Sequence, residues 1–125
     1  MNVVDSSGWL EYFADDINAD FFALAIENVG ELIVPSISIY EVFKRVIQQR
    51  DESSALQAIA NMQQGQVVDL DINLALSAAK ISSELNLPMA DSIILATSRA
   101  YEAVLWTQDS DFADIDDVKY IEKVK

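Results

Sequence analysis

The 125-residue chain contains no cysteine and no histidine. The absence of cysteine excludes disulfide bonds, thiolate nucleophiles and cysteine-ligated zinc or iron–sulfur sites. The absence of histidine excludes a Ser-His-Asp triad, a histidine-ligated metal and an imidazole general base. Any catalysis must therefore come from carboxylates, hydroxyls, lysine or arginine. These groups favour a mechanism that uses a hard metal ion.

Glycine, proline and long apolar runs are also scarce. The chain has 3 glycines and 2 prolines, and 51% of its residues are hydrophobic. No apolar run approaches the roughly 20 residues of a membrane span, and the N-terminus lacks the basic and apolar regions of a secretory signal. We therefore expect a cytoplasmic protein with no membrane contact, folded as one domain over residues 1–125.

Basic residues are few as well. Only 8 lysines and arginines stand against 21 aspartates and glutamates, which gives a net charge of −13, and the first basic residue is Lys44. Such a charge opposes direct binding to a phosphate backbone. A nucleic-acid partner would therefore need a metal ion or a basic protein to mediate the contact.

Short apolar runs alternate with helical patterns along the chain. Strands are predicted at 2–4, 32–35, 66–70 and 103–107, with a weaker fifth at 118–121. Helical patterns cover 9–13, 17–29, 36–50, 52–64, 72–85 and 88–101, and Gly30 is placed to end the second of them. This alternation predicts an α/β fold: a mostly parallel central sheet of four to five strands, with helices on both faces.

Carboxylates occur where such a fold binds its ligands, at the carboxyl ends of the strands. Asp5 follows the first predicted strand and Asp109 follows the fourth, while Glu41 and Asp91 lie near the starts of helices. Four carboxylates that converge on one edge would form a site for Mg²⁺ or Mn²⁺, since both prefer oxygen ligands.

Each of these acids also has a structural interpretation. Asp109 begins a run of five acids in nine residues, and such a run is usually a solvated loop. Asp5 is placed to cap the first helix. Glu41 completes a capping box with Ser38 and has Arg45 four residues later as a surface partner. Asp91 is favoured near a helix N-terminus, although its apolar surroundings require a counter-charge. Aromatic residues such as Tyr40 are interpreted as core or interface rather than as base-stacking groups.

Four segments together resemble a known family. They are Asn-Val-Val-Asp-Ser-Ser (2–7), Ser-Ile-Ser-Ile-Tyr-Glu-Val (36–42), Pro-Met-Ala-Asp-Ser-Ile-Ile-Leu-Ala (88–96) and Leu-Trp-Thr-Gln-Asp-Ser-Asp-Phe (105–112). In this order they resemble the motifs of PIN-domain proteins, specifically VapC-type toxin ribonucleases of type II toxin–antitoxin pairs. The resemblance covers the whole chain and implies a single PIN-like nuclease domain.

The resemblance implies a Mg²⁺-dependent endoribonuclease, with Mn²⁺ as a substitute ion. Asp5, Glu41, Asp91 and Asp109 would hold the metal and carry catalysis, and Asp111 would assist as a further metal ligand. Ser6 and Thr107 would orient ligands or water. A metal ion lowers the pKa of a bound water, so attack on phosphorus needs no histidine, and Glu41 or Asp109 could accept the proton.

Partners follow from the same resemblance. We expect an RNA substrate, a homodimer and a small antitoxin protein that lies along the helices at 36–64. Its inhibitory element would be an arginine or lysine that reaches the acidic site. The predicted antitoxin-binding residues are Ile37, Tyr40, Val46, Ile47, Leu56, Ile59 and Met62.

Two alternatives remain open at this stage. A receiver-like phosphoacceptor domain would use Asp5, Asp69 or Asp71, and Thr107, but it needs paired acids after the first strand and a lysine after the fifth. Ser6 and Ser7 replace the paired acids, and Lys119 precedes or lies within the last strand. The second alternative is a catalytically inactive PIN-like interaction module, in which the carboxylates act only as caps.

Overall fold

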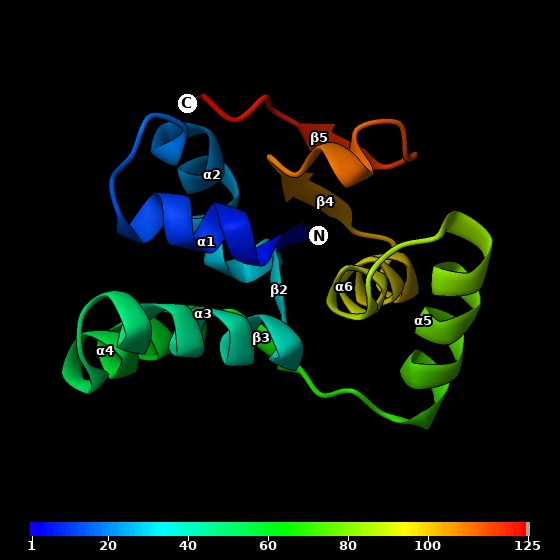
Figure 1. The fold of residues 1–125 in the computed structure, drawn as a ribbon, viewed down its shortest axis with the longest axis horizontal. Helices are drawn as coiled ribbons and strands as arrows, with labels where there is room; N and C mark the ends of the chain where they lie inside the picture. The colour runs from blue at the N-terminus through cyan, green and yellow to red at the C-terminus, as the bar shows by residue number, and fades with distance from the viewer. Residues whose placement is uncertain (125) are drawn as a thin grey trace.

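The computed structural model describes residues 1–124, in which a five-stranded sheet has helices on both faces (Figure 1). The strands are β1 (Asn2–Val4), β2 (Leu32–Pro35), β3 (Gln66–Val68), β4 (Val104–Thr107) and β5 (Val118–Tyr120). Their order across the sheet is β3-β2-β1-β4-β5, and every neighbouring pair is parallel. The predicted α/β fold is confirmed, with a sheet that is entirely parallel.

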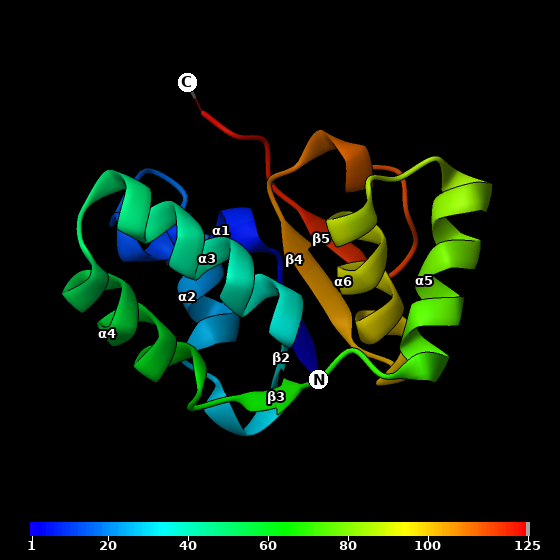
Figure 2. The same cartoon turned by 60° about the horizontal axis from the view of Figure 1, so that its bottom comes forward.

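Two groups of helices cover the two faces of the sheet. The helices α1 to α4 lie on one side of the sheet, and α5 and α6 lie on the other (Figure 2). No helix within residues 1–124 is both long enough and apolar enough to cross a membrane. The helices are α1 (Ser6–Phe13), α2 (Ala19–Ile26), α3 (Ser36–Gln49), α4 (Glu52–Met62), α5 (Ile72–Leu85) and α6 (Met89–Ala100), with 3₁₀ turns η1 (Val29–Glu31) and η2 (Ser110–Phe112).

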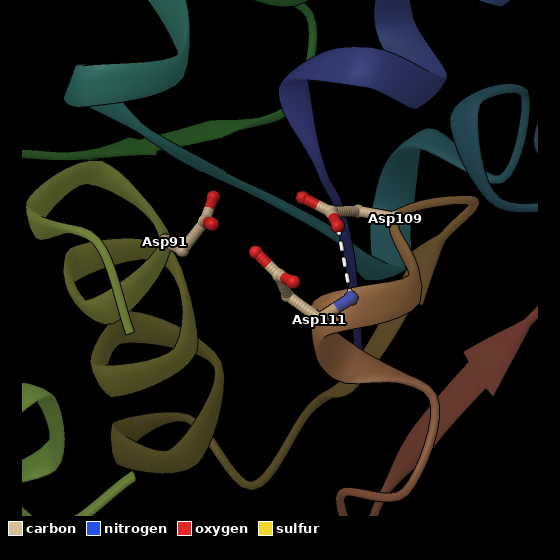
Figure 3. A group of neighbouring side chains, drawn as sticks. All are labelled: Asp91, Asp109 and Asp111. Atoms are coloured by element: carbon tan, nitrogen blue, oxygen red, sulfur yellow. Dashed lines mark hydrogen bonds between the residues drawn. The ribbon is translucent and has the colours of Figure 1, made fainter. Parts of the chain in front are cut away.

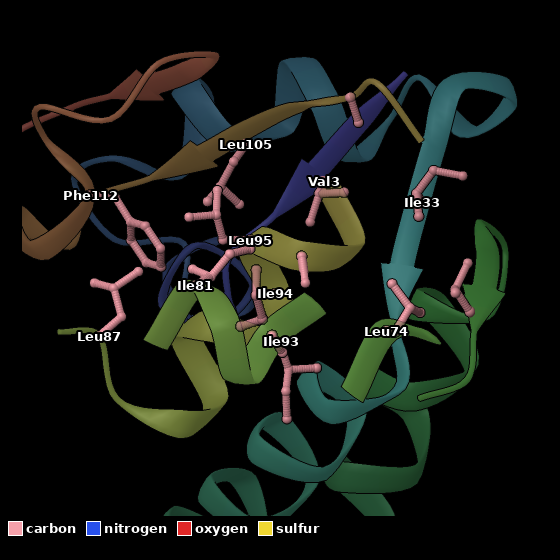
Figure 4. Close-up of a cluster of buried hydrophobic side chains, with 14 residues drawn as sticks. Val3, Ile33, Leu74, Ile81, Leu87, Ile93, Ile94, Leu95, Leu105 and Phe112 are labelled. Atoms are coloured by element: carbon pink, nitrogen blue, oxygen red, sulfur yellow. The ribbon is translucent and has the colours of Figure 1, made fainter. Parts of the chain in front are cut away.

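The hydrophobic core consists of two layers, because successive side chains of a strand point to opposite faces. Val3 and Leu105 pack in the layer beneath α5 and α6, which Figure 4 shows. Their chain neighbours Val4 and Trp106 pack in the layer beneath α1 to α4. Strands buried on both faces explain why the sequence shows short continuous apolar runs rather than alternation.

The path of the chain creates a switch point between β1 and β4. The chain starts at the central strand β1, moves outward to β2 and β3, and then returns to β4 on the other side of β1. Val4 and Trp106 are register partners, so the residues that follow them emerge side by side. In open parallel sheets, ligands bind at such a point.

Local details differ from the sequence-based prediction in two places. The helix predicted at 17–29 is α2, which ends at Ile26 with Glu27 as its C-cap. Gly30 lies within η1, so the prediction that it ends this helix is wrong. The third strand ends at Val68 because the next residues lead directly to Asp71, whose side chain caps α5 through the Leu74 amide.

Gly8 allows α1 to pack closely on its neighbours. A Cβ atom at this position would lie 2.5 Å from a ring carbon of Phe22 and 2.8 Å from a methyl of Val4. Both contacts are shorter than van der Waals packing permits. The glycine therefore holds the start of α1, with Ser6 and Ser7, against the carboxyl end of β1.

Candidate metal centre

Five acidic side chains from four parts of the chain gather at the carboxyl edge of the sheet. Asp5 directly follows β1, Asp109 and Asp111 follow β4, Glu41 lies in the second turn of α3, and Asp91 lies in the first turn of α6. Residues far apart in sequence meet here because the parallel strands end at the same edge.

Three of these carboxylates form the tightest group. One carboxylate oxygen from each of Asp91, Asp109 and Asp111 lies within 4.8 Å of the other two. Figure 3 shows Asp91 on α6 pointing across to the two aspartates of the loop after β4. An all-oxygen set of this kind fits Mg²⁺ or Mn²⁺. Asp111, which the resemblance placed among the metal ligands, belongs to this group.

Asp5 is held behind the group by two hydroxyls. Its side chain is only 4% exposed and makes no capping hydrogen bond to α1, so the interpretation of Asp5 as a cap is not supported. Instead its Oδ2 accepts 2.9 Å hydrogen bonds from Ser7 Oγ and Thr107 Oγ1. Burial raises the pKa of Asp5 to about 6; the two hydroxyls lower it and the Asp109 charge raises it.

Asp91 is repelled by all four of the other acids in this group. Burial, followed by repulsion from the other four acids, Asp5, Asp109, Glu41 and Asp111, raises the pKa of Asp91 to about 7. The counter-charge expected from the sequence is absent in residues 1–124, where no lysine or arginine side chain lies within 4.0 Å of a carboxylate. A divalent cation would offset this repulsion, so the residues fit a metal ion.

Glu41 on α3 contacts the start of α1. Its Oε1 accepts a 2.7 Å hydrogen bond from Ser6 Oγ, the contact through which Ser6 touches the acidic group. The capping-box interpretation is wrong because α3 begins at Ser36 with Pro35 as its N-cap, which places Ser38 inside the helix. The expected ion pair with Arg45 does not form.

Ser38 is a residue that the sequence did not indicate as part of the site. Its hydroxyl is buried and has no hydrogen-bond partner among residues 1–124. Ser38 lies three residues before Glu41, and residues at this spacing are neighbours on a helix surface. A buried hydroxyl without a partner is costly, so this atom points to a water or ligand in its surroundings. The unpaired hydroxyl is a second indication, besides the acids, of a group bound near Glu41.

Buried polar residues also fix the loop that carries Asp109. The Thr107 hydroxyl accepts a 2.9 Å hydrogen bond from the Asp109 amide. The next side chain, Gln108, is buried, accepts from Asn18 Nδ2 at 3.0 Å and donates to Glu11 Oε1 at 3.1 Å. The sequence analysis missed Gln108 and Asn18, because nothing in their local sequence marks them as buried.

The predicted antitoxin-binding residues do not all reach the surface. Met62 is fully buried and belongs to the core, so its prediction as a contact residue is wrong. Val46 is 8% exposed and lines a hollow between α1, α3 and α4. Ile37 and Ile59 are partly buried against the core. The other three, Tyr40, Ile47 and Leu56, are exposed.

The receiver-like alternative is contradicted by the topology. A receiver places its third strand beside its first, whereas β3 is here an edge strand and β4 lies beside β1. Asp71 caps α5 instead of facing Asp5. Lys119 lies within β5, with its ammonium 4.4 Å from the centre of the Trp106 ring.

Similar proteins were found by sequence family and by structure. Residues 3–118 match the family model of the PIN domain, and no curated protein matches the chain. A toxin–antitoxin complex from Klebsiella pneumoniae is 21% identical, with a TM-score of 0.80 over 95% of this chain and 96% of that one. VapC20 from Mycobacterium tuberculosis, a sarcin–ricin loop cleaving toxin, is 16% identical, with a TM-score of 0.75 over 90% and 93%. DNA-bound VapBC from Salmonella typhimurium is 15% identical, with a TM-score of 0.74 over 97% and 96%.

Proposed function

Because the chain belongs to the PIN domain family, we propose that it is a Mg²⁺-dependent endoribonuclease and the toxin of a type II toxin–antitoxin pair. The observation that carries this proposal is the oxygen-lined group of Asp91, Asp109 and Asp111 at the switch point of the sheet. The similarity to a sarcin–ricin loop cleaving toxin and to toxin–antitoxin assemblies supports it. Mn²⁺ would serve as a substitute ion.

The acidic residues divide into two roles. Asp91, Asp109 and Asp111 hold the ion directly, and Asp5 adds negative charge from behind them. When bound, the ion supplies a water of lowered pKa and positive charge that offsets the scissile phosphate. Thr107 keeps Asp5 and Asp109 at a fixed separation through its two hydrogen bonds.

Glu41 is the proposed proton acceptor. Ser6 Oγ donates a hydrogen bond to Oε1 of Glu41, whereas Oε2 accepts no hydrogen bond from the described part of the chain. That oxygen can take the proton from the attacking water, as a general base must. Ser6 therefore orients the carboxylate and leaves its other oxygen free.

An antitoxin is the proposed protein partner. A hollow of about 420 Å³ lies between α1, α3 and α4, lined by Phe13, Val46, Arg50 and Ala58 among others. The exposed Ile47 and Leu56 lie on the same two helices, α3 and α4. An amphipathic helix of the antitoxin would bind such a surface. A basic side chain from it would inhibit the enzyme by replacing the metal charge among the acids.

A homodimer is proposed on a different surface. Ile72 and Leu76, four residues apart on the same side of α5, are 79% and 67% exposed. Exposed apolar side chains that gather on one face mark interaction surfaces. A second copy of the chain would cover them.

Cleavage assays test the proposed activity. RNA should be cut by the parent protein in Mg²⁺ or Mn²⁺, but not in EDTA, and not by Asp91→Asn in any metal. A parent that binds its partner but cuts no RNA would favour the inactive interaction module instead. Cleavage that continues in EDTA would argue against the metal centre.

A further inference from the structure

The outward side of α3 carries a second hollow beside the acids. It has a volume of about 210 Å³, and we refer to it as the α3 groove. Glu41, which binds Ser6 at the metal centre, also lines this groove. The α3 groove therefore adjoins the acidic site through Glu41. Its lining residues are Tyr40, Glu41, Lys44, Arg45 and Gln48.

Two cations in the α3 groove have no acidic partner. Lys44 and Arg45 are both exposed, and within residues 1–124 no lysine or arginine side chain pairs with a carboxylate. Glu41 lies four residues before Arg45, yet it binds Ser6 instead. In a protein with 21 acids and 8 bases, two unpaired cations beside the site are available to a bound anion.

An exposed aromatic ring lies next to these cations. Tyr40 is 60% exposed, and the ammonium of Lys44 lies 5.8 Å from the centre of its ring. The sequence suggested a core or interface position for this side chain, but α3 turns it to solvent. Sites for single-stranded nucleic acids combine such parts, since cations bind the phosphates and aromatic rings stack on the bases.

We propose that the α3 groove binds the nucleotide that adjoins the scissile phosphate of a single-stranded RNA. Lys44 and Arg45 bind its phosphates, Tyr40 stacks on its base, and the amide of Gln48 adds a hydrogen-bonding group. This inference rests on the proposed ribonuclease function.

The remaining cations do not join the α3 groove. Arg50 lines the separate hollow between α1, α3 and α4, and Arg99 lines another beside the end of α6. Lys123 lines a third hollow, together with Asp109. Within residues 1–124, the basic side chains that line the α3 groove are therefore Lys44 and Arg45. Single-stranded binding weakens with salt by about 0.7 logarithmic units per phosphate contact, so two contacts give a slope near −1.4.

The first experiment measures RNA affinity by fluorescence anisotropy. The probe is a labelled single-stranded RNA of about 12 nucleotides, titrated in Ca²⁺ so that binding is observed without rapid cleavage. The double variant Lys44→Gln/Arg45→Gln should bind at least about tenfold more weakly and lose most of the salt dependence. The matched control Lys80→Gln/Arg99→Gln removes the same charge from exposed positions elsewhere and should bind within about twofold of the parent.

A second pair of variants separates stacking from charge. Tyr40→Ala should weaken RNA binding roughly tenfold without changing the salt slope, because the variant loses base stacking but no charge. Tyr40→Phe keeps the ring and should bind like the parent. Thermal unfolding should show that both variants remain folded, since the side chain is exposed.

Three results would overturn the inference. Equal weakening by the two double variants would mean a general charge effect, and no weakening by Lys44→Gln/Arg45→Gln would mean that RNA binds elsewhere. Tighter binding of poly-glutamate than of RNA would assign the α3 groove to an acidic polypeptide.

If the parent cuts no RNA, the proposed function fails, and the binding titrations alone test whether the α3 groove binds RNA. If the parent cuts RNA and Lys44→Gln/Arg45→Gln binds and cuts equally well, only the α3 groove is wrong.

Discussion

The hydroxyl of Thr107 donates a 2.9 Å hydrogen bond to the carboxylate of Asp5, across 102 residues of sequence. The same hydroxyl accepts the Asp109 amide at 2.9 Å and is completely buried. One side chain at the end of β4 thus sets the positions of two acids, because β1 and β4 are paired in parallel register.

Replacing Thr107 by valine should destabilise the protein and reduce its activity. The change leaves the Asp109 amide and the Asp5 carboxylate without this partner, and a lost buried hydrogen bond costs about 1–3 kcal/mol. Urea unfolding would measure the loss, and cleavage of RNA in Mg²⁺ should fall at least tenfold. Thr107→Ser keeps the hydroxyl and should retain most activity. A valine variant that matches the parent in both assays would disprove the positioning role.

Replacing Asp91 by asparagine should abolish cleavage and stabilise the metal-free fold. Asparagine keeps the shape but removes a charge that four other acids repel. In EDTA at pH 8 we expect a gain of about 1 kcal/mol, or roughly 4 °C in the melting temperature. Asp116→Asn is the control, since this exposed acid lies outside the metal group. An equal shift in both variants would mean a general effect of net charge, whereas lower stability of Asp91→Asn would indicate a structural role.

The stability of the metal-free protein should fall as the pH rises from about 4 to 8. The pKa of Asp91 is raised to about 7 and that of Asp5 to about 6, from a usual value of 3.8. Between these values the folded state binds more protons than the unfolded state, so the free energy of unfolding decreases with increasing pH. This contribution is complete below about pH 4 and is lost above about pH 7. Melting curves in EDTA should show a steeper decline for the parent than for Asp91→Asn, and parallel declines would refute the assignment.

Divalent metal should reverse this loss at pH 8. An ion that binds only the folded state adds about 2.7 kcal/mol at one hundred times its dissociation constant. Melting temperatures across a Mg²⁺ or Mn²⁺ titration should rise for the parent and much less for Asp111→Asn, which removes one of the three grouped ligands. Asp114→Asn, an exposed neighbour outside the group, should behave like the parent. If Asp111→Asn responds to metal as fully as Asp114→Asn, Asp111 is not a ligand.

Much of this fold could be predicted from local sequence patterns. The apolar runs at Asn2–Val4, Leu32–Pro35 and Val104–Thr107 are strands as expected, and their alternation with helical periodicity is sufficient to indicate a parallel sheet. The position of Asp5 after β1 and of Asp109 after β4 followed from the same pattern. These features were predictable because strand and helix periodicity are properties of consecutive residues.

Only the tertiary structure decided how the acids are used. The resemblance placed Asp111 among the metal ligands, but only the fold brings it to Asp91, because η2 lies beside the start of α6. Ser38 and Glu41 matched a capping box, but α3 begins at Ser36 with Pro35 as its N-cap, and Glu41 accepts a hydrogen bond from Ser6. Met62 and Val46 had the spacing of an exposed apolar face, whereas packing of α3 and α4 on the sheet buried them. The burial and the hydrogen-bond partners of these side chains depend on contacts between residues distant in sequence. Sequence periodicity identifies the apolar face of a helix, but it does not identify the element against which that face packs.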